Sequence, residues 1–486
     1  MNAFDYFFEF TFQFEEPFLV GKENITFKEL YKSSVSLANQ INEEIGEGKN
    51  ILLISPNNLF FMITYLAILK SGNICIPLDP NIEKDNFTYI AELTKPDLVF
   101  LTKDIERRLP VSLYKCVIAD DLSIEKINNK TSHQVEDFNG EKCAEIIFTS
   151  GSTGKPKGVM ISHKNLISNT RSILEYLKLN KDDRMLVVLP FYYCYGLSLL
   201  HTHLRIGGSI VFNNSFIFLG AIINNLLDYK CTGFAGVPSH FQILLRMSDS
   251  FKKTKFPDLR YVTQAGGKLA TVFIDEFRNS FPDISFIVMY GQTEATARLS
   301  YLPHELYENK KGSIGKGIPG VTLKVVNEKN KNIKPGEIGE VIARGDNVML
   351  GYFADEEGTR NTLRNGWLYT GDLGTIDDDG YIFLTARKKE IIKVGGKRVS
   401  PKEIEAVILQ IPEVVDCSIE GVDDPLQGEA LKASIVLRKG TKTYINEDTI
   451  KQHCAKYLVL YKIPHIYELM DQIVISPTGK KIKSNL

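Results

Sequence analysis

Short apolar runs alternate with helix-like segments along the first half of the chain. ILLIS (51–55) and ICIPLDP (74–80) have the continuous apolar pattern of buried strands, and LFFMITYLAILKSG (59–72) between them has the pattern of a helix. The strand pattern returns in DLVFLT, MLVVLP, GSIVF and FIVMY, with helical stretches such as FIDEFRNSF between some of them. Apolar strands that alternate with helices predict layered α/β structure with mainly parallel sheets.

Two changes of pattern divide the rest of the chain. From about Gly312, short strands with glycine and proline turns predict an antiparallel, β-barrel-like subdomain over about 312–385. After Lys389, strands and helices alternate within about 100 residues, which predicts a small α+β unit. We therefore expect a large N-terminal domain over 1–387 and a small C-terminal domain over 388–486.

The composition is that of a globular enzyme of more than one domain. The chain has 486 residues, 43% of them apolar and 24% charged, and its net charge of −1 favours neither a nucleic-acid nor a membrane-surface partner. It starts without a secretory signal, and its longest apolar run, 216–223, is far shorter than the roughly 18 residues of a membrane span. Seven scattered cysteines without a CxxC pair fit reduced thiols in the cytoplasm and no zinc site.

The stretch FTSGSTGKPKGV (148–159) has the composition of a phosphate-binding loop. It is not the P-loop of kinases and GTPases, because Pro156 follows its Gly-Lys pair and Thr149 stands where that motif needs glycine. AEIIFT (144–149) and GVMIS (158–162) both have strand patterns, so the loop is expected to connect two strands. Its glycines and hydroxyls can turn N–H and O–H donors toward an anion, although a hydrophilic hairpin turn is an equal alternative on composition alone.

Further motifs follow this loop in a fixed order: YGQTEA (290–295), GEIGEV (336–341), GYF (351–353), YTGDLG (369–374), ARKKEIIKVGGKRVSPKEIE (386–405) and SPTGKKIK (476–483). Together they resemble the adenylate-forming superfamily, which holds acyl- and aryl-CoA synthetases, the adenylation domains of nonribosomal peptide synthetases, and luciferase. The resemblance covers essentially the whole chain. It implies ATP and Mg²⁺ as cofactors.

The resemblance also implies a set of ATP-binding residues. The glycine-rich loop would hold the pyrophosphate of ATP, with its lysines, Lys155 and Lys157, as phosphate contacts; the residues expected to bind ATP there are Thr149, Ser150, Gly151, Ser152, Thr153, Gly154 and Lys155. The YGQTE stretch would contribute Tyr290, Gly291, Gln292, Thr293 and Glu294. Thr293 would bind the α-phosphate, and Glu294 would hold Mg²⁺, an ion that proteins often bind through one carboxylate plus substrate phosphates.

Two residues near the predicted domain boundary correspond to the ribose-binding positions of the family. Asp372 lies in a glycine-rich turn, YTGD, after a strand, and would accept the ribose hydroxyls; a turn or N-cap aspartate is the alternative. Arg387 would also reach the ribose, and a surface arginine on a strand is the alternative reading of that residue.

The resemblance implies a mobile C-terminal domain that carries the main catalytic residue. Lys480 would bridge the substrate carboxylate and the α-phosphate, although Lys481 beside it is a rival. Lys389 would be the hinge about which the domain rotates, and Gly395 and Gly396 would line the channel for a pantetheine arm.

The implied reaction has two steps. A carboxylic acid attacks the α-phosphorus of ATP, releasing pyrophosphate and forming an acyl-adenylate, and a thiol then displaces AMP. The thiol would belong to CoA or to the phosphopantetheine of a carrier protein, and it would act in trans because the chain ends at Leu486.

The segment LPFYYCYGLS (189–198) is expected to border the acyl pocket, with Tyr192 and Tyr193 occupying space and Gly266 and Gly267 leaving it. Amino-acid-activating relatives usually carry an aspartate in this segment to pair with an α-ammonium group. None is present, which favours an acid without that group. Arg298 could meet a polar substrate tail, but a structural ion pair is the favoured expectation for it.

The preferred hypothesis is therefore an AMP-forming acid–thiol ligase. Three alternatives remain: an amino-acid-activating ligase of the same fold, a luciferase-like adenylating oxygenase, and a nucleotide-binding protein without catalysis. The last predicts a broken site, yet the five main candidates are all present: Lys155, Glu294, Asp372, Arg387 and Lys480.

Overall fold

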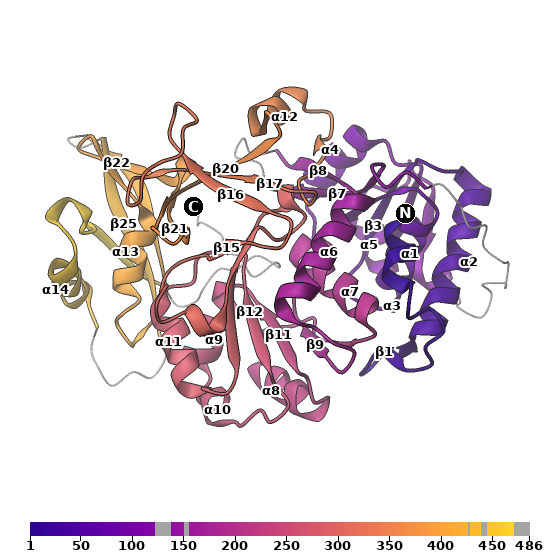
Figure 1. Ribbon diagram of the computed structural model, residues 1–486, viewed down its shortest axis with the longest axis horizontal. Coiled ribbons are helices and arrows are strands. Elements are labelled where there is room, and N and C mark those ends of the chain that lie inside the picture. The colour runs from indigo at the N-terminus through magenta and orange to yellow at the C-terminus, as the bar shows by residue number, and fades with distance from the viewer. Residues whose placement is uncertain (122–137, 150–154, 426–427, 439–444, 471–486) are drawn as a thin grey trace.

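The computed structural model describes residues 1–121, 138–149, 155–425, 428–438 and 445–470 (Figure 1). Two large sheets form the body of the molecule. One has seven strands, in the order β18 (Gly351–Tyr352), β8 (Lys157–Ser162), β7 (Cys143–Thr149), β4 (Ile74–Leu78), β3 (Asn50–Ile54), β5 (Leu98–Leu101) and β6 (Cys116–Ile118). The strands from β7 to β6 are parallel, while β8 and β18 run antiparallel at one edge.

The second large sheet has nine strands. Their order is β15 (Lys316–Gly317), β14 (Ser300–Leu302), β13 (Ser285–Tyr290), β12 (Tyr261–Gln264), β11 (Gly233–Gly236), β9 (Arg184–Val187), β10 (Ser209–Phe212), β1 (Pro17–Leu19) and β2 (Ile25–Thr26). The six strands from β13 to β1 are parallel. Both large sheets confirm the predicted α/β class with mainly parallel pairing.

Helices fill the space between the two sheets and cover their outer faces (Figure 1). The inner helices and α2, which packs on α3, share one buried apolar cluster with both sheets: α1 (Ala3–Phe8), α2 (Phe27–Ile45), α3 (Leu59–Lys70), α6 (His163–Leu177) and α7 (Cys194–Ile206). Helix α3 is apolar almost all round because it lies inside this layer. The outer helices are α4 (Lys84–Thr94) and α5 (Lys103–Arg108) on the first sheet, and α8 (Leu219–Asp228), α9 (Pro238–Met247), α10 (Asp249–Lys253) and α11 (Thr271–Ser280) on the second.

A smaller antiparallel sheet follows, as the turn-rich sequence predicts. It contains β16 (Thr322–Val326), β17 (Gly339–Arg344), β19 (Leu363–Arg364), β20 (Trp367–Ile376) and β21 (Ile382–Arg387), with α12 (Glu356–Thr362) before β19. A turn at Asp379-Gly380 precedes β21, and Asp377 holds it by accepting the N–H groups of Asp379 and Tyr381.

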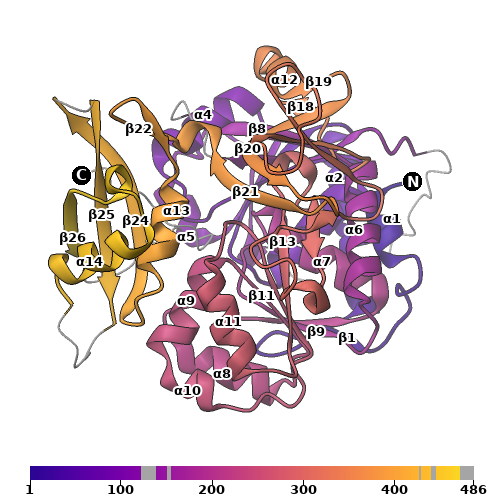
Figure 2. The ribbon, with the colours of Figure 1, turned by 60° about the vertical axis from the view of Figure 1, so that its left-hand side comes forward.

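The C-terminal α+β unit begins after the short helix η5 (Lys388–Glu390) and lies on one side of the body (Figure 2). Its elements are β22 (Ile392–Val394), β23 (Lys397–Val399), α13 (Pro401–Ile408), β24 (Val414–Asp424), β25 (Gly428–Leu437), α14 (Glu447–Tyr457) and β26 (Ile466–Met470). It packs on α9, where Arg246 Nη1 donates to the Ile411 carbonyl at 2.8 Å and Gln242 Nε2 donates to Asp416 at 3.2 Å. Arg246 and its bonds are buried, so they fix this arrangement in the state described.

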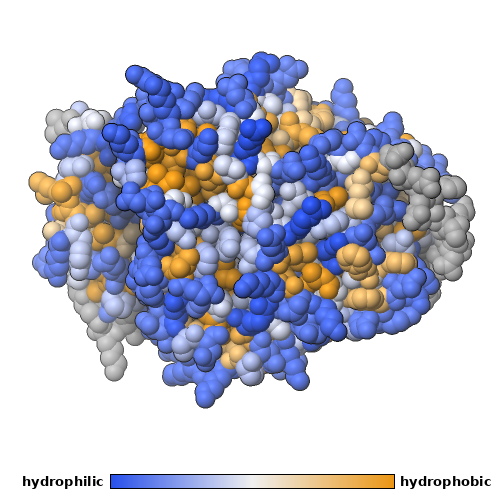
Figure 3. Space-filling model, in the orientation of Figure 1, coloured by the Kyte–Doolittle hydropathy of each residue, from blue (hydrophilic) through white to orange (hydrophobic). Residues whose placement is uncertain are grey.

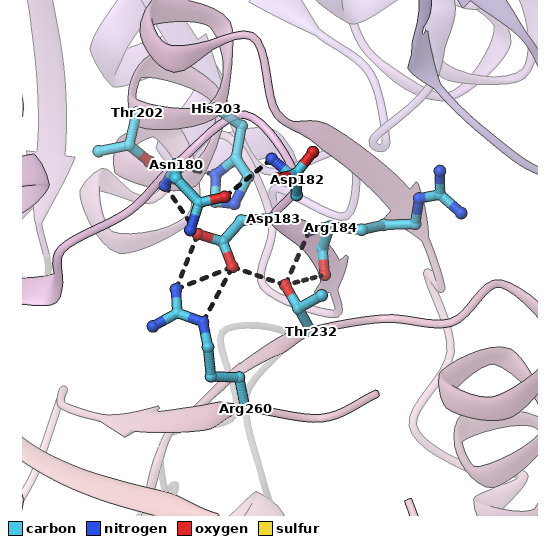
Figure 4. Close-up of polar contacts among 8 residues, drawn as sticks. All are labelled: Asn180, Asp182, Asp183, Arg184, Thr202, His203, Thr232 and Arg260. Atoms are coloured by element: carbon cyan, nitrogen blue, oxygen red, sulfur yellow. Dashed lines mark hydrogen bonds and ion pairs between the residues drawn. The ribbon is translucent and has the colours of Figure 1, made fainter. Parts of the chain in front are cut away.

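Three parallel strands of the second sheet are fixed together at their N-terminal ends by Asp183 (Figure 4). Its buried carboxylate accepts two hydrogen bonds from Arg260 Nη2, at 2.7 and 2.8 Å, and one from Thr232 Oγ1 at 2.8 Å. The Asn180 N–H group donates a further bond at 2.8 Å. Asp183, Thr232 and Arg260 directly precede β9, β11 and β12. This cluster therefore fixes the register of these strands at their N-terminal ends and leaves their C-terminal ends for other contacts.

A second buried polar group connects the seven-stranded sheet to two helices of the layer between the sheets. Tyr65 of α3 donates a hydrogen bond to Glu145 of β7 at 2.8 Å, and His201 Nε2 of α7 lies 2.8 Å from the same hydroxyl. Burial raises the pKa of the Glu145 carboxyl from 4.5 to about 7, against the opposing effect of the Tyr65 hydrogen bond. Burial also lowers the pKa of His201 to about 3, so the histidine is neutral.

Candidate active site

The carboxyl ends of β9, β11, β12 and β13 meet at one edge of the second sheet, since these strands are parallel neighbours. Ligands of open α/β sheets bind at such an edge. The segments that leave these strands contain several of the predicted site residues, and two contacts bring those segments together. Cys194 Sγ lies 3.6 Å from Thr293 Oγ1, and a Cβ atom added to Gly266 would lie 3.3 Å from the Tyr193 hydroxyl.

The YGQTEA stretch forms a tight, strained turn at the end of β13. A Cβ atom on Gly291 would lie 1.9 Å from the Ala297 carbonyl oxygen, so no other residue fits there without displacing the backbone. Thr293 and Glu294 lie in the one-turn helix η3 (Thr293–Ala295), and Thr296 and Ala297 behind it have positive φ values of 58° and 126°. Non-glycine residues in such conformations are strained and cluster at functional sites.

Glu294 is held by a residue from the distant GYF motif. Tyr352, in β18, donates a hydrogen bond to Glu294 Oε1 at 2.8 Å. Within the described residues Oε2 of this half-buried carboxylate accepts no further bond, so it can serve as an oxygen ligand of a hard cation such as Mg²⁺. The sequence motif containing Tyr352 was identified, but its role as the partner of Glu294 was missed, because two segments 58 residues apart meet only in the folded chain.

The glycine-rich loop connects two antiparallel strands, as predicted. Strands β7 and β8 pair from Cys143↔Ser162 to Thr149↔Lys157, so the loop closes a hairpin. Residues 150–154, which include the predicted Ser150, Gly151, Ser152, Thr153 and Gly154, lie outside the described residues. Lys155 is exposed, with its ammonium 5.3 Å from the centre of the Tyr89 ring.

Lys157 has a different role from the phosphate contact expected of it. Its ammonium forms an ion pair with Asp355 at 2.7 Å and lies 5.0 Å from the centre of the Tyr352 ring. These contacts connect β8 to the segment after β18, so Lys157 helps to fix the position of Tyr352. Lys155 is therefore the lysine of the described part of this hairpin that remains available to an anion.

Asp372 lies between two residues that support its negative charge. Tyr290 donates a hydrogen bond to Asp372 Oδ2 at 2.7 Å, and Arg387 Nε lies 3.2 Å from Oδ1. Burial raises the pKa of Asp372, and Arg387 and Tyr290 oppose that rise. Arg387 is an exposed residue on the strand β21, as its alternative reading expected, but it also pairs with Asp372, so three separately predicted residues form one cluster.

The predicted position of Asp372 in a turn after a strand was wrong. Asp372 lies within the long strand β20 and pairs with Arg387 of β21. The pairing of β20 with β17 shifts at this point, and Gly371 has φ +74°, so the glycine-rich sequence marks a bulge rather than a turn. A bulge redirects a side chain without ending the strand.

The predicted acyl pocket is lined by aromatic residues. Tyr193 is the residue before α7, and burial raises its pKa above the usual value. Tyr192 is also largely buried. Its hydroxyl forms a hydrogen bond with Asp79, so this hydroxyl is not available to a substrate. Gly267 lies against Pro238, 3.2 Å from where its Cβ would be. The structure thus brings Tyr193 and Gly266 together, while Tyr192 faces a different partner.

The structural ion pair expected for Arg298 is absent. This arginine has only 2% of its surface exposed, yet none of its contacts within the described residues is with a carboxylate. Instead its guanidinium carbon lies 4.0 Å from the centre of the Tyr195 ring.

The C-terminal candidates follow this cluster along the chain or lie outside the described residues. Lys480 and Lys481 belong to the segment 471–486, which is not described. Lys389 lies in η5, between the small sheet and the C-terminal unit. Gly395 and Gly396 form the turn between β22 and β23 with φ values of +53° and +77°, and an added Cβ atom would meet nothing within 4 Å at either position.

A layered α/β body, a strained Thr-Glu turn at a sheet edge and a buried aspartate beside a tyrosine and an arginine define a nucleotide-dependent enzyme of the adenylate-forming superfamily. Residues 11–353 match the family model described as AMP-binding enzyme, and residues 403–480 match the model described as AMP-binding enzyme C-terminal domain. The chain belongs to the AMP-binding enzyme family, and within the superfamily it is an AMP-forming ligase of the acyl-CoA synthetase branch.

Similar proteins include plant CoA ligases, and similar solved structures include a bacterial protein with ATP bound. Oxalate–CoA ligase of Arabidopsis thaliana is 30% identical, over 95% of this chain and 92% of its own, and 4-coumarate–CoA ligase 1 of Petroselinum crispum is 29% identical, over 96% and 89%. Among solved structures, ATP-bound MatB from Rhodopseudomonas palustris superposes with a TM-score of 0.87 at 26% identity, over 99% of this chain and 97% of that one. None of the helices formed by the described residues is both long and apolar enough to cross a membrane.

Proposed function

We propose that this protein activates a carboxylic acid with ATP and Mg²⁺ to an acyl-adenylate, releasing pyrophosphate, and then transfers the acyl group to the thiol of CoA. In the first step a carboxylate oxygen attacks the α-phosphorus and the bond to the pyrophosphate oxygen breaks. In the second step the thiolate attacks the acyl carbon and AMP leaves. The observation that carries this proposal is the cluster of Tyr290, Asp372 and Arg387 beside the Thr293–Glu294 turn.

The residues of this cluster bind the nucleotide in distinct ways. Asp372 accepts hydrogen bonds from the two ribose hydroxyls, and Arg387 and Tyr290 keep it ionised for that purpose. Gly291 and Gln292 contact the adenine through the backbone of the turn, and Thr293 donates its hydroxyl to the α-phosphate. Mg²⁺, when bound, neutralises charge on the phosphates, and Glu294 Oε2 is the ligand offered to it by the protein.

The hairpin residues Thr149 to Lys155 hold the leaving pyrophosphate with N–H, hydroxyl and ammonium donors. Lys480 bridges the attacking carboxylate and the α-phosphate. A preorganised charge at that place is worth roughly 100- to 1,000-fold in rate. Strands β7 and β8 pair as far as Thr149 and Lys157. The loop between them therefore starts and ends at paired residues, which supports its proposed role in holding pyrophosphate.

We further propose that the N-terminal domain covers residues 1–387 and the C-terminal domain residues 388–486. The small domain rotates about Lys389 between the two half-reactions. Gly395 and Gly396, which have open space beside them, then line the channel for the pantetheine arm. The position of η5 between the small antiparallel sheet and the C-terminal unit supports a hinge there.

The acid is one without an α-ammonium group, because the segment 189–198 contains no carboxylate to pair with it. CoA is the preferred thiol, and the phosphopantetheine of a separate carrier protein is the alternative acceptor. A cytoplasmic location is proposed because none of the seven cysteines, all of which lie in the described residues, is joined in a disulfide, and five of them are buried, as expected in a reducing compartment.

ATP–pyrophosphate exchange against a panel of carboxylic acids tests the first step, and thioester formation with CoA or carrier protein tests the second. Lys480→Ala should abolish exchange, by at least about 100-fold, while leaving ATP binding largely intact. Lys481→Ala is the matched control and should retain most of the exchange. Equal losses in both variants, or exchange that persists in Lys480→Ala, would contradict the assignment of the catalytic lysine, and an enzyme that exchanges with no acid would contradict the function.

A further inference from the structure

Arg298 is a buried cation with no carboxylate among its described contacts. Its Nη1 donates to the Ala297 carbonyl at 3.4 Å and its Nη2 donates to Ser198 Oγ at 3.3 Å, which are both long bonds. Its Nε is buried without a partner in the described part of the chain. A guanidinium has five N–H donors, and the described groups that accept from this one are a carbonyl, a hydroxyl and the Tyr176 phenol, all of them neutral.

Arg246, which is as buried as Arg298, pairs with a carboxylate, and so does the more exposed Arg260. Arg260 makes two bonds to Asp183, as Figure 4 shows. Arg246 pairs with Glu276 at 3.4 Å and also donates to two backbone carbonyls. A buried charge without an opposite charge costs several kcal/mol, so Arg298, which is as buried as Arg246 but has no carboxylate among its described contacts, calls for an anion from outside the chain.

Arg298 lies against the segment 189–198, which is expected to border the acyl pocket, because it contacts Ser198 and Tyr195 of that segment. It follows Glu294 by four residues, directly after the strained pair Thr296 and Ala297. Its guanidinium stacks on Tyr195, the residue after Cys194, whose sulfur contacts the Thr293 hydroxyl. A continuous set of contacts therefore leads from the residue assigned to the α-phosphate to this arginine.

Three tyrosines surround the same guanidinium. Burial raises the pKa values of Tyr176, Tyr193 and Tyr195, and the positive charge of Arg298 opposes that rise for each of them. The backbone of Arg298 is also fixed, because its carbonyl accepts a hydrogen bond from Asn347 Nδ2 at 2.7 Å. The cation is thus preorganised in an aromatic, water-poor wall where electrostatic interactions are strong.

We propose that Arg298 recognises a second carboxylate on the acid, so that the substrate is a compact dicarboxylic acid. One carboxylate is adenylated beside Thr293, and the other pairs with the guanidinium, whose planar fork matches a carboxylate with two parallel hydrogen bonds. An acid with an uncharged tail leaves the buried cation unpaired and is rejected. This inference rests on the proposed acid-activating function and specifies its substrate class.

The first test compares matched acids on the wild-type enzyme by ATP–pyrophosphate exchange. Straight-chain dicarboxylates from oxalate to adipate are each paired with their monomethyl ester and with the monocarboxylate of equal length. For the best dicarboxylate, kcat/KM should exceed that of its ester by at least about 100-fold, because a site built for a hydrogen-bonding group discriminates strongly against analogues that lack it. Comparable or better values for the esters or monocarboxylates would overturn the proposal.

The second test removes the cation. Arg298→Met keeps an unbranched side chain without charge, and it should bring the ratio of kcat/KM between dicarboxylate and ester close to one, mainly through a higher KM for the dicarboxylate. Arg298→Lys should restore part of the preference, since it keeps the charge but loses the fork. The KM for ATP should stay the same in both variants. Arg260→Lys, at the other end of the strands, is the control for replacing an arginine and should leave the ratio unchanged.

The outcomes separate this inference from the proposed function. Exchange that is supported equally well by charged and uncharged acids retains the ligase function and overturns the dicarboxylate. Exchange with no acid at all overturns both. If Arg298→Met does not fold, the comparison of acids on the wild-type enzyme and the Arg298→Lys variant still decide the question.

Discussion

Glu145 should hold its proton until about pH 7, and replacing it by glutamine should change how stability depends on pH. The carboxyl is fully buried between the two large sheets, where it accepts a hydrogen bond from Tyr65. Its pKa rises from 4.5 to about 7 because burial penalises the ionised form. A group with a raised pKa of this kind stabilises the fold below pH 4.5, and that contribution is lost as the pH rises from 4.5 to about 7.

The size of the effect follows from the same pKa values. Each pKa unit corresponds to about 1.4 kcal/mol, so the interval from 4.5 to about 7 corresponds to about 3 kcal/mol of unfolding free energy. Glutamine has the shape of the protonated carboxyl and keeps an acceptor for Tyr65, but it does not titrate. Relative to wild type, Glu145→Gln should therefore gain about 3 kcal/mol between pH 4.5 and pH 8.

Comparing two variants isolates this carboxyl from the histidines. The pKa values of His163, His201 and His240 are lowered by burial to about 3, so these residues add stability that is lost as the pH falls below about 6.5. Their effect has the opposite sign, and it cancels in the difference because both proteins contain the same histidines.

Denaturant unfolding at a series of pH values supplies the difference, and infrared spectroscopy supplies a direct check. The C=O band of a protonated carboxylic acid should be present in wild type, absent in Glu145→Gln, and lost with a midpoint near pH 7. A difference in stability that is flat between pH 5 and pH 8 would contradict the reasoning. A difference of the opposite sign would mean that Glu145 is ionised and paired with a protonated His201.

Two substitutions near the proposed nucleotide site should test, one each, the charge of Asp372 and the close backbone packing at Gly291. Tyr290→Phe removes the 2.7 Å hydrogen bond to Asp372, so the pKa of Asp372 should rise further and the KM for ATP should increase by about tenfold, more at pH 6 than at pH 8. An increase independent of pH would argue against that linkage. Gly291→Ala places a Cβ atom 1.9 Å from the Ala297 carbonyl oxygen and should reduce pyrophosphate exchange by at least about 100-fold. Gly220→Ala, where nothing lies within 4 Å, should be silent in the same assay.

The periodic parts of the fold could be predicted because each strand and helix carries its own pattern. The run 51–55 became β3 (Asn50–Ile54), and 59–72 became α3 (Leu59–Lys70), with boundaries that differ by one or two residues. The hairpin around the glycine-rich loop was also predictable, since apolar runs flank it on both sides. Short-range patterns specify elements of this kind without help from distant residues.

Contacts between distant segments could not be predicted in the same way. Lys157 looked like a phosphate ligand because it stands in a basic loop, but the ion pair with Asp355 depends on how β18 adds to β8. Asp372 looked like a turn residue because glycine precedes it, yet β17 and β21 on either side hold it within a strand. In each case a tertiary partner that no local pattern reveals decided the role.

The buried polar groups of this protein differ in whether the chain itself completes their hydrogen bonds. A group that the chain completes stabilises the fold, whereas a group that it leaves incomplete can recognise a ligand. Asp183 accepts bonds from Arg260, Thr232 and the Asn180 backbone, so any ligand would have to displace a complete set. Glu145 avoids an unpaired charge by keeping its proton. Arg298 can do neither, because a guanidinium does not lose its proton in proteins and its described neighbours are phenols, a hydroxyl and a carbonyl. The remaining way to satisfy it is an anion that arrives with the substrate, and a fold that tolerates this cost in the apo state gains discrimination against every acid that lacks the second charge.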